Sequence, residues 1–413
     1  MATLISNIKL LVNTRSESCL LRGAALSQLP CLEKAYLIVE GPHIAEYGEM
    51  KKLGHQPEAF AFHVDATGKM VLPSWCDSHT HLVFAGSREG EFIDKIKGAS
   101  YAEIAAKGGG ILASAKKIAA ISEEALYQQS YKRLQEVIKL GTGAIEIKSG
   151  YGLSIDGELK MLRVIKRLKA ASAIPVKTTF LGAHAVPSAY NKNRQDYIRL
   201  VVEEMLPVIA KEGLADFVDV FCETNFFTPE ETAYICDTGK SYGLLPKIHA
   251  NQLHVSGGVQ AGINVNALSV DHLESLDEAA IAALAESNTI GTLLPTAAFF
   301  LRMHYPPARD LITAGCAVAL ASDYNPGSSP SGNMNFVVAL SCIQLKLLPE
   351  EAINAATING AFAMGVQDEV GSITAGKKAN LILTKEIPSL HYLPYAFGEN
   401  NIEKVMVSGE WMF

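Results

Sequence analysis

Eight short apolar runs recur along the middle of the chain, and each is followed by polar residues and a segment of helical periodicity. The runs are rich in Val, Ile, Leu and Ala without clean alternation, which is typical of parallel strands covered on both faces. Strand followed by helix, eight times over, predicts an α/β fold, a (β/α)₈ TIM barrel. The runs are Val71–Cys76, Gly143–Lys148, Val176–Leu181, Phe217–Phe221, Pro246–Ala250, Ala267–Asp271, Thr289–Leu294 and Ala317–Ala321.

Apolar stripes and capping residues indicate helices between these runs. Leu134 and Ile138 recur at helical spacing on one side of a segment whose other positions carry charges. Further along, Thr228 precedes Pro229 and stands three residues before Glu231, the order of a capping box with proline at the first helical position. A doubly wound sheet is the alternative, but it needs a topological switch point and usually has fewer strands.

The two ends of the chain have a different pattern. They contain short strand-like pieces such as Tyr36–Glu40, Asn380–Thr384 and Lys404–Ser408, separated by Gly, Pro and Asn turns. We therefore expect a small β-sandwich domain formed from both termini, residues 1–65 plus 366–413, beside a catalytic barrel over residues 66–365.

Composition and charge narrow the class of protein. The chain has 413 residues, 48% of them hydrophobic and 19% charged, which excludes a disordered or disulfide-stapled protein. A net charge of −7 without basic runs argues against a nucleic-acid partner. Seven scattered cysteines without a Cys-x-x-Cys pair are typical of a reduced cytosolic protein. No signal-peptide pattern or long apolar stretch occurs, so we expect a cytoplasmic protein with no membrane partner.

Candidate chemistry lies where the barrel strands end, because barrel enzymes place their active sites there. His79 and His81 follow the first run two residues apart, so both rings point to one side. His249 is the next-to-last residue of the fifth run, His272 follows the sixth and Asp323 lies two residues after the eighth. A lone His-x-His is common by chance, but five such residues at strand ends predict a metal site. With His79, His81, His249 and Asp323 as ligands, it suits Zn²⁺ and would also serve Fe or Mn.

This arrangement resembles the amidohydrolase superfamily, which comprises metal-dependent barrel hydrolases with a small β-sandwich built from both termini. The closing segments Val370–Ile373 and Gly376–Leu381 are also similar to the tail of that superfamily. Many members carry a carboxylated lysine after the fourth strand that bridges two metals. This chain has Cys222-Glu223-Thr224 there, so we infer a single metal ion per chain, Zn or Fe.

Within the superfamily, seven blocks in the same order resemble the imidazolonepropionase family. The resemblance implies hydrolysis of a small-molecule substrate, 4-imidazolone-5-propanoate, to N-formimidoyl-L-glutamate in histidine degradation. It also suggests a homodimer. The blocks are His79–Arg88, Lys107–Ile111, Ser149–Leu153, Thr179–Pro187, Val218–Glu223, Leu293–Leu301 and Ala319–Pro330.

The implied substrate gives several polar residues a role. Its propanoate is an anion, and Arg88 offers a planar guanidinium for bidentate binding, the alternative being an ion pair with Glu89 or Glu91. Tyr151 lies between two glycines and is expected to hydrogen-bond to or stack on the ring, or else to anchor its loop. A neutral His184 would polarise the ring carbonyl or hold the substrate, with a structural role as its alternative. The resemblance adds three substrate contacts after the eighth strand: Asn325, Gly327 and Ser328.

One position departs from a common pattern. Many mononuclear relatives carry a proton-transferring glutamate three residues after the fifth-strand histidine, whereas this chain has Gln252. An amide cannot act as a general base, so Gln252 is expected to orient the substrate ring. We expect Asp323 to take a proton from metal-activated water, and the hydroxide to attack the ring carbonyl. The metal, with His272 or His184, would stabilise the charge on oxygen before the C–N bond breaks.

Other functions compete with this one. Another cyclic-amide hydrolase or deaminase of the superfamily would share the metal ligands and differ only in the pocket. A non-catalytic barrel typically loses ligands, whereas all five candidates are present. A phosphate-binding barrel would use Gly108–Gly110, but the G-x-x-x-x-G-K-[ST] pattern is missing. A covalent hydrolase would need a G-x-S-x-G elbow, which the sequence does not contain.

Overall fold

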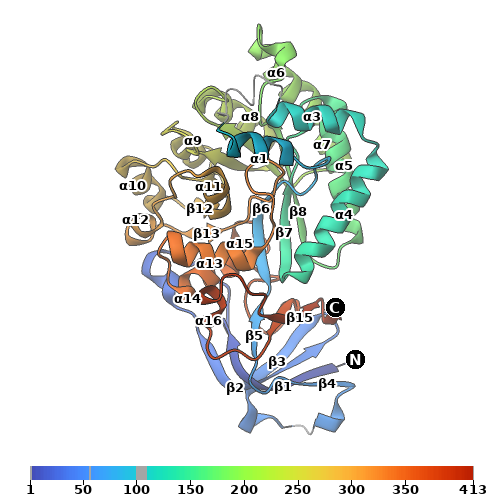
Figure 1. The fold of residues 1–413 in the computed structure, drawn as a ribbon, viewed down its shortest axis with the longest axis vertical. Helices are drawn as coiled ribbons and strands as arrows, with labels where there is room; N and C mark the ends of the chain where they lie inside the picture. Colours follow the sequence, from blue (N-terminus) through green and yellow to red (C-terminus); the bar gives the residue numbers. More distant parts are fainter. Residues whose placement is uncertain (1, 55–56, 99–108, 413) are drawn as a thin grey trace.

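The structure is a computed structural model that describes residues 2–54, 57–98 and 109–412. Lys107 and Gly108 of the glycine-rich block named above therefore lie outside the described residues. Figure 1 shows a larger unit covered by helices above a smaller unit made of strands, with both chain termini at the smaller unit.

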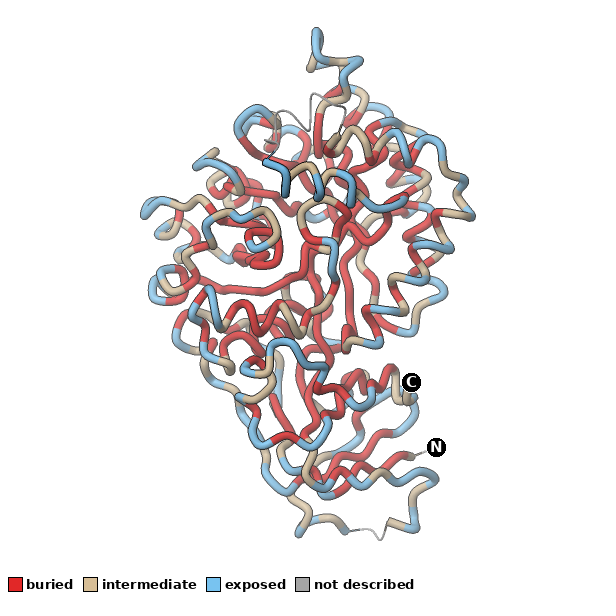
Figure 2. The backbone as a smooth tube through the Cα atoms, viewed as in Figure 1, coloured by how far each residue is buried: buried red, intermediate tan, exposed pale blue. Residues whose placement is uncertain are grey.

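Eight parallel strands form the barrel, hydrogen-bonded in the order β13-β12-β11-β10-β9-β8-β7-β6. Their residues are almost all buried, which explains why the apolar runs lack alternation. Figure 2 shows this burial concentrated along the barrel strands. The strands are β6 (Trp75–Thr80), β7 (Thr142–Lys148), β8 (Val176–Ala183), β9 (Phe217–Cys222), β10 (Leu245–Ala250), β11 (Ser269–His272), β12 (Ile290–Leu293) and β13 (Val318–Leu320).

The predicted barrel is confirmed, with one correction to its first strand. The run Val71–Cys76 is divided at Ser74 between two sheets. Its first part is β5 (Met70–Pro73), which pairs with β1 (Ala2–Val12) and β14 (Leu381–Thr384) in the terminal sheet. Only the part from Trp75 onward enters the barrel: the Ser74 N–H still donates to Asn380 beside the terminal sheet, whereas the Trp75 N–H donates to Gly141 beside β7.

The barrel closes where its first and last strands meet, and this closure assembles part of the site. The backbone N–H of His81 donates to the carbonyl of Tyr324 across 2.9 Å. The N–H of Asp323 donates to the carbonyl of His79 across 3.0 Å. Residues about 240 positions apart in the sequence are thereby held side by side at the carboxyl ends of the strands.

Helices cover the outside of the barrel (Figure 1). The predicted capping box is present at Thr228, and the predicted apolar stripe of α4 is buried at Leu134 and Ile138. The helices are α1 (Glu89–Ile96), α3 (Ile111–Ala120), α4 (Glu123–Lys139), α5 (Ile155–Ala171), α6 (Arg194–Arg199), α7 (Leu206–Glu212), α8 (Pro229–Ser241), α9 (Gly258–Asn264), α10 (Glu278–Glu286), α11 (Pro295–Leu301), α12 (Ala308–Thr313), α13 (Met334–Gln344), α14 (Pro349–Ala356), α15 (Ile358–Phe362) and α16 (Tyr392–Tyr395). Shorter 3₁₀ turns are η1 (Gly23–Ser27), η2 (Met50–Lys52), η3 (Pro57–Ala59) and η4 (Ser188–Tyr190), and η5 (Leu200–Met205) is a π-helical turn.

Strands from both termini form a second sheet, as predicted. Its hydrogen bonds run in one continuous path, β16-β15-β14-β5-β1-β2-β3, with β4 also paired to β1. A bulge in β1 between Ile5 and Ile8 lets β4 pair before it and β5 after it. Because β5 belongs to this sheet, the sheet extends past the predicted division at residue 65. The remaining strands are β2 (Cys31–Glu40), β3 (His43–Glu49), β4 (Phe62–Asp65), β15 (Ile402–Val407) and β16 (Glu410–Met412).

No helix among the described residues is both long and apolar enough to span a lipid bilayer.

Candidate metal centre and active site

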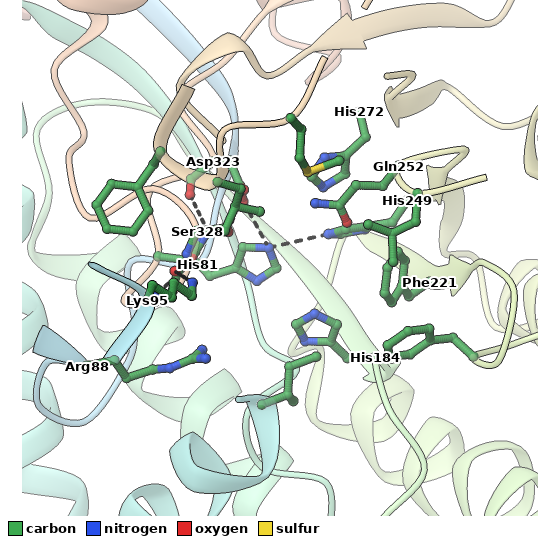
Figure 3. A pocket seen from close by; sticks show the side chains of 18 of the residues that line it. His81, Arg88, Lys95, His184, Phe221, His249, Gln252, His272, Asp323 and Ser328 are labelled. Atoms are coloured by element: carbon green, nitrogen blue, oxygen red, sulfur yellow. Dashed lines mark hydrogen bonds and ion pairs between the residues drawn. The ribbon is translucent and has the colours of Figure 1, made fainter. Parts of the chain in front are cut away.

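Three imidazoles and one carboxylate converge at the carboxyl ends of β6, β10 and β13. Nε2 of His79 and Nε2 of His81 each lie 3.6 Å from Oδ1 of Asp323. Nε2 of His249 lies 3.4 Å from Nε2 of His81. Figure 3 shows the ring of His81 between Asp323 and His249, with a dashed line to each. The structure thus brings together the four residues predicted as metal ligands.

The surroundings of His79 fit a metal ligand. Nδ1 of His79 donates to Oδ2 of Asp271 across 2.6 Å, and Nε2 is buried without a hydrogen-bond partner. A carboxylate on one ring nitrogen fixes the tautomer and turns the lone pair of the other nitrogen outward, as at metal-bound histidines. Burial lowers the pKa of His79 well below 6.5, so the ring is neutral and can bind a cation.

His249 and His81 are buried like His79, but neither ring makes a hydrogen bond through Nδ1. Nδ1 of His249 lies 3.0 Å from Oδ2 of Asp219, at an angle too bent for a hydrogen bond. The backbone N–H of His249 donates to the other oxygen of Asp219 across 3.1 Å. Burial lowers the pKa of both His81 and His249 well below 6.5. All three imidazoles are therefore neutral donors, as metal binding requires.

The loop after β13 holds Asp323 in place. Asp323 has a backbone φ of 52°, and its Oδ2 accepts a hydrogen bond of 3.1 Å from Oγ of Ser328. The Asn325 amide donates to the Asp323 carbonyl and to Oγ of Ser328 and accepts from the N–H groups of Gly327 and Ser328. Burial raises the pKa of Asp323 to about 6. Asn325 therefore shapes this loop in addition to facing the cavity.

His272 lies beside the candidate metal ligands. A nitrogen of His272 lies within 4.8 Å of a ligand atom of His79 and of Asp323. Its Nδ1 lies 3.4 Å from Oε1 of the buried Glu274. Burial lowers the pKa of His272, but Glu274, Asp323 and Asp271 outweigh burial and raise it. A ring with this set of neighbours can carry a proton toward the metal centre.

A cavity of about 660 Å³ opens above these residues. Figure 3 shows Arg88, Lys95, His184 and Gln252 around the same space as His81 and His249. His79 is not among its lining residues. Every other predicted site residue lines it, namely His81, Arg88, Tyr151, His184, His249, Gln252, His272, Asp323, Asn325, Gly327 and Ser328.

Arg88 lines the cavity and also forms one of the alternative ion pairs. Its Nη2 lies 2.6 Å from Oε2 of Glu91, while its Nε is buried without a partner. A side chain at position 327 would collide with the guanidinium, so Gly327 is required for this placement. Lys95, which the sequence analysis missed, lies two helical turns further along α1 and lines the same wall. The seven-residue spacing between Arg88 and Lys95 could have identified Lys95 from the sequence, because residues seven apart share a helix face.

His184 and Tyr151 face the cavity from the ends of β8 and β7. Nδ1 of His184 lies 3.0 Å from the Gly150 carbonyl oxygen, which can only accept, so Nδ1 donates and Nε2 is left as an acceptor. Gly150 has a φ of 106°, and a Cβ there would approach Nδ1 of His184 to 2.9 Å. Burial lowers the pKa of His184 to about 4. The ring of Tyr151 lies 5.5 Å from that of His184, centroid to centroid.

The turn that carries Gln252 is fixed by two buried side chains. Oδ1 of Asn251 accepts from the Gly258 N–H, and Nδ2 donates to the Ser275 carbonyl. Oε2 of Glu223 accepts from the backbone N–H of Leu253 across 2.8 Å, and Oε1 lies 3.1 Å from Nδ1 of His254. Glu223 is thus occupied in holding this turn. Four further residues line the cavity: Phe221, Phe226, Phe300 and His254. No local sequence pattern predicts their place there, because separate elements bring them together.

Comparisons with known proteins agree with this geometry. The model of the amidohydrolase family matches residues 70–412. An imidazolonepropionase of Flavobacterium johnsoniae is 54% identical, over 99% of this chain and 100% of that protein. One from Geobacillus sp. strain WCH70 is 44% identical, over 93% of this chain and 91% of that protein. The solved E. coli guanine deaminase superposes with a TM-score of 0.75 at 14% identity, over 100% of this chain and 99% of that chain.

The last likeness concerns the fold alone, whereas the match to the Flavobacterium johnsoniae protein extends over 99% of this chain. The chain belongs to the amidohydrolase family and, within it, to the imidazolonepropionases.

Proposed function

We infer that this chain hydrolyses 4-imidazolone-5-propanoate to N-formimidoyl-L-glutamate, a step of histidine degradation. The observation that carries this inference is a cavity with His81, His249 and Asp323 at its floor, His79 buried against them, and a guanidinium and an ammonium at its wall. A planar ring with a short carboxylate side chain fits this cavity, with the ring at the metal donors and the carboxylate at the guanidinium and the ammonium. Identity with imidazolonepropionases over the full length supports the same activity.

The proposed metal ligands are His79, His81, His249 and Asp323. Three neutral imidazoles and a carboxylate suit Zn²⁺ and also Fe, so the ion is one of these two. One ion per chain is proposed because Glu223, after the fourth barrel strand, is bonded to the 253–254 turn and to His254. When bound, the metal lowers the pKa of a water and polarises a carbonyl oxygen.

Substrate binding is assigned to the opposite wall. The propanoate binds Arg88, with Lys95 supplying a further positive charge because Glu91 already pairs with Arg88. Tyr151 contacts the ring, and Gln252 orients it through its amide. The loop residues Asn325, Gly327 and Ser328 complete this side of the cavity.

Proton transfer is assigned to Asp323 and His272. Asp323 takes a proton from the attacking water, since its carboxylate lies among the metal donors. His272 donates a hydrogen bond to the ring oxygen as negative charge develops there. The bond between the carbonyl carbon and the ring nitrogen then breaks, Asp323 passes the proton taken from water to that nitrogen, and the new carboxyl group loses its proton to solvent to become a carboxylate.

His184 has a narrower role than the sequence suggested. Because its Nδ1 donates to Gly150, its Nε2 accepts and cannot donate to an oxyanion. We therefore propose that His184 accepts an N–H of the substrate and holds the ring, while His272 alone faces the developing charge.

The test is turnover of the named substrate by purified protein of known metal content. Wild-type protein should remove the ultraviolet absorbance of 4-imidazolone-5-propanoate and release N-formimidoyl-glutamate, detectable by mass spectrometry. His249→Ala should lose both metal and turnover, while the exposed His391→Ala should keep both. Inactive wild-type protein loaded with Zn or Fe would overturn the proposal.

We also propose a cytoplasmic location and a homodimer. The seven cysteines are all unpaired, in keeping with a reducing compartment. Cell fractionation and light scattering test the two statements.

A further inference from the structure

A cluster of five charged side chains lies inside the barrel beneath the proposed metal ligands. Its members are two lysines and three carboxylates, and each is at most 1% exposed. The mechanism above uses none of them directly. Burying five charges is costly, so their arrangement calls for a functional reason. They are Glu146, Lys148, Asp219, Lys247 and Asp271.

Lys148, at the end of β7, is the centre of this cluster. Its Nζ lies 2.7 Å from Oε1 of Glu146, 2.7 Å from Oδ2 of Asp219 and 3.5 Å from Oδ2 of Asp271. The last two oxygens also face the metal ligands. Oδ2 of Asp271 is the atom that accepts from His79, and Oδ2 of Asp219 is the atom nearest Nδ1 of His249.

One ammonium therefore joins two carboxylates that each face a different metal-ligand histidine. We propose that Lys148 is a positioning residue for the metal centre, holding Asp219 and Asp271 together so that the lone pairs of His249 and His79 stay aimed at one ion. The inference rests on the proposed metal site and goes beyond its ligand set.

The physical reason is the repulsion between like charges in a dry interior. Without Lys148, the carboxylates of Asp219 and Asp271 face each other with less compensation and move apart. Asp271 then releases or turns the imidazole of His79, and Asp219 shifts the backbone N–H that it holds at His249. Loss of a group that orients a ligand typically costs metal affinity, even though no ligand is removed.

Lys247 provides a matched control. It is also fully buried and also pairs with Glu146, but its other contacts are the backbone carbonyls of Ser78 and Ala363, 3.1 Å away in each case. Both lysines contribute one charge to the cluster, but of these two described residues only Lys148 forms ion pairs with Asp219 and Asp271. A purely structural role would make the two lysines equivalent.

The experiment measures the Zn²⁺ affinity of apo-protein by competition with a chromogenic chelator, for wild type, Lys148→Met and Lys247→Met. We expect Lys148→Met to weaken binding by roughly tenfold to a hundredfold, with Lys247→Met within about threefold of wild type. The d–d spectrum of bound Co²⁺ should change in Lys148→Met and stay unchanged in Lys247→Met. Circular dichroism of each apo-protein establishes that it is folded.

Equal losses in the two variants, or no loss in Lys148→Met, would overturn the inference. If Lys148→Met does not fold, the double-mutant cycle of Asp219→Asn and Asp271→Asn replaces it. Coupled effects on Zn²⁺ affinity support a shared lysine, and additive effects contradict it. Wild-type protein that binds no metal would instead refute the proposed metal site.

Discussion

Nη2 of Arg88 lies 2.6 Å from Oε2 of Glu91 at the wall of the active-site cavity. The guanidinium that we propose binds the propanoate is therefore already paired on one side. Its remaining donors are fixed in direction, because Glu91 also accepts the backbone N–H of Gly110 at the start of α3. The pair joins two elements around the site and presents a preset donor face to an incoming carboxylate.

Replacing Arg88 should weaken substrate binding more than it slows the chemical step. Hydrogen bonds to charged groups contribute about 1.5–3 kcal/mol, so Arg88→Met should raise KM by roughly ten- to a hundredfold. Steady-state kinetics test this, with the exposed Arg199→Met as a control that leaves KM unchanged. An unchanged KM in Arg88→Met would remove the assignment of the propanoate site.

Lys95 should contribute to the same recognition. We expect Lys95→Met to raise KM by about fivefold, since a partly exposed charge is worth roughly 1 kcal/mol. Lys97→Met removes the same charge just beyond the end of α1 at an exposed position outside the cavity, and should have no effect. Competitive inhibition by imidazole-4-propanoate and by 4-propylimidazole separates recognition of the carboxylate from recognition of the ring and chain, because only the first inhibitor carries the carboxylate. If Lys95→Met weakens both inhibitors equally, Lys95 does not read the carboxylate.

The pH profile should not depend on His184. Because burial lowers the pKa of His184 to about 4, the ring is neutral above pH 5 and does not change charge in the working range. His184→Gln should lower kcat/KM by about tenfold or less through a lost hydrogen bond. The acid limb of the profile between pH 5 and 7 should remain. Its disappearance in the variant would show that His184 is the titrating group.

Metal removal should abolish activity without unfolding the barrel. The strands are buried by apolar side chains away from the proposed ligands, so dialysis against a chelator should leave the far-ultraviolet circular dichroism unchanged. We expect turnover to fall at least a hundredfold, because a water with an ordinary pKa near 16 replaces one near 7. Adding back Zn²⁺ and Fe²⁺ separately identifies the effective ion. Full activity in metal-free protein would exclude the proposed chemistry.

The order of elements and the position of the site followed from the sequence. Parallel barrel strands are buried on both faces, so they appear as unbroken apolar runs, and seven of the eight runs coincide with single barrel strands. Because such barrels carry their sites at the carboxyl ends of strands, the polar residues after the runs gave the candidate ligands, which the fold brings together. The first run misled at Ser74, since a strand of the terminal sheet and a barrel strand are both apolar and adjoin there.

Tertiary structure alone decided what surrounds those residues. The pairing of Arg88 with Glu91, the tautomer of His184 and the contacts of Lys148 depend on which oxygen lies within hydrogen-bonding distance. Lys148 and Asp271 are only polar ends of apolar runs in the sequence, although folding buries them together. The periodicity of apolar residues shows which face of a helix or strand is buried, because buried positions favour apolar side chains. Partners across the barrel come from separate strands, and no local pattern specifies the distance between them.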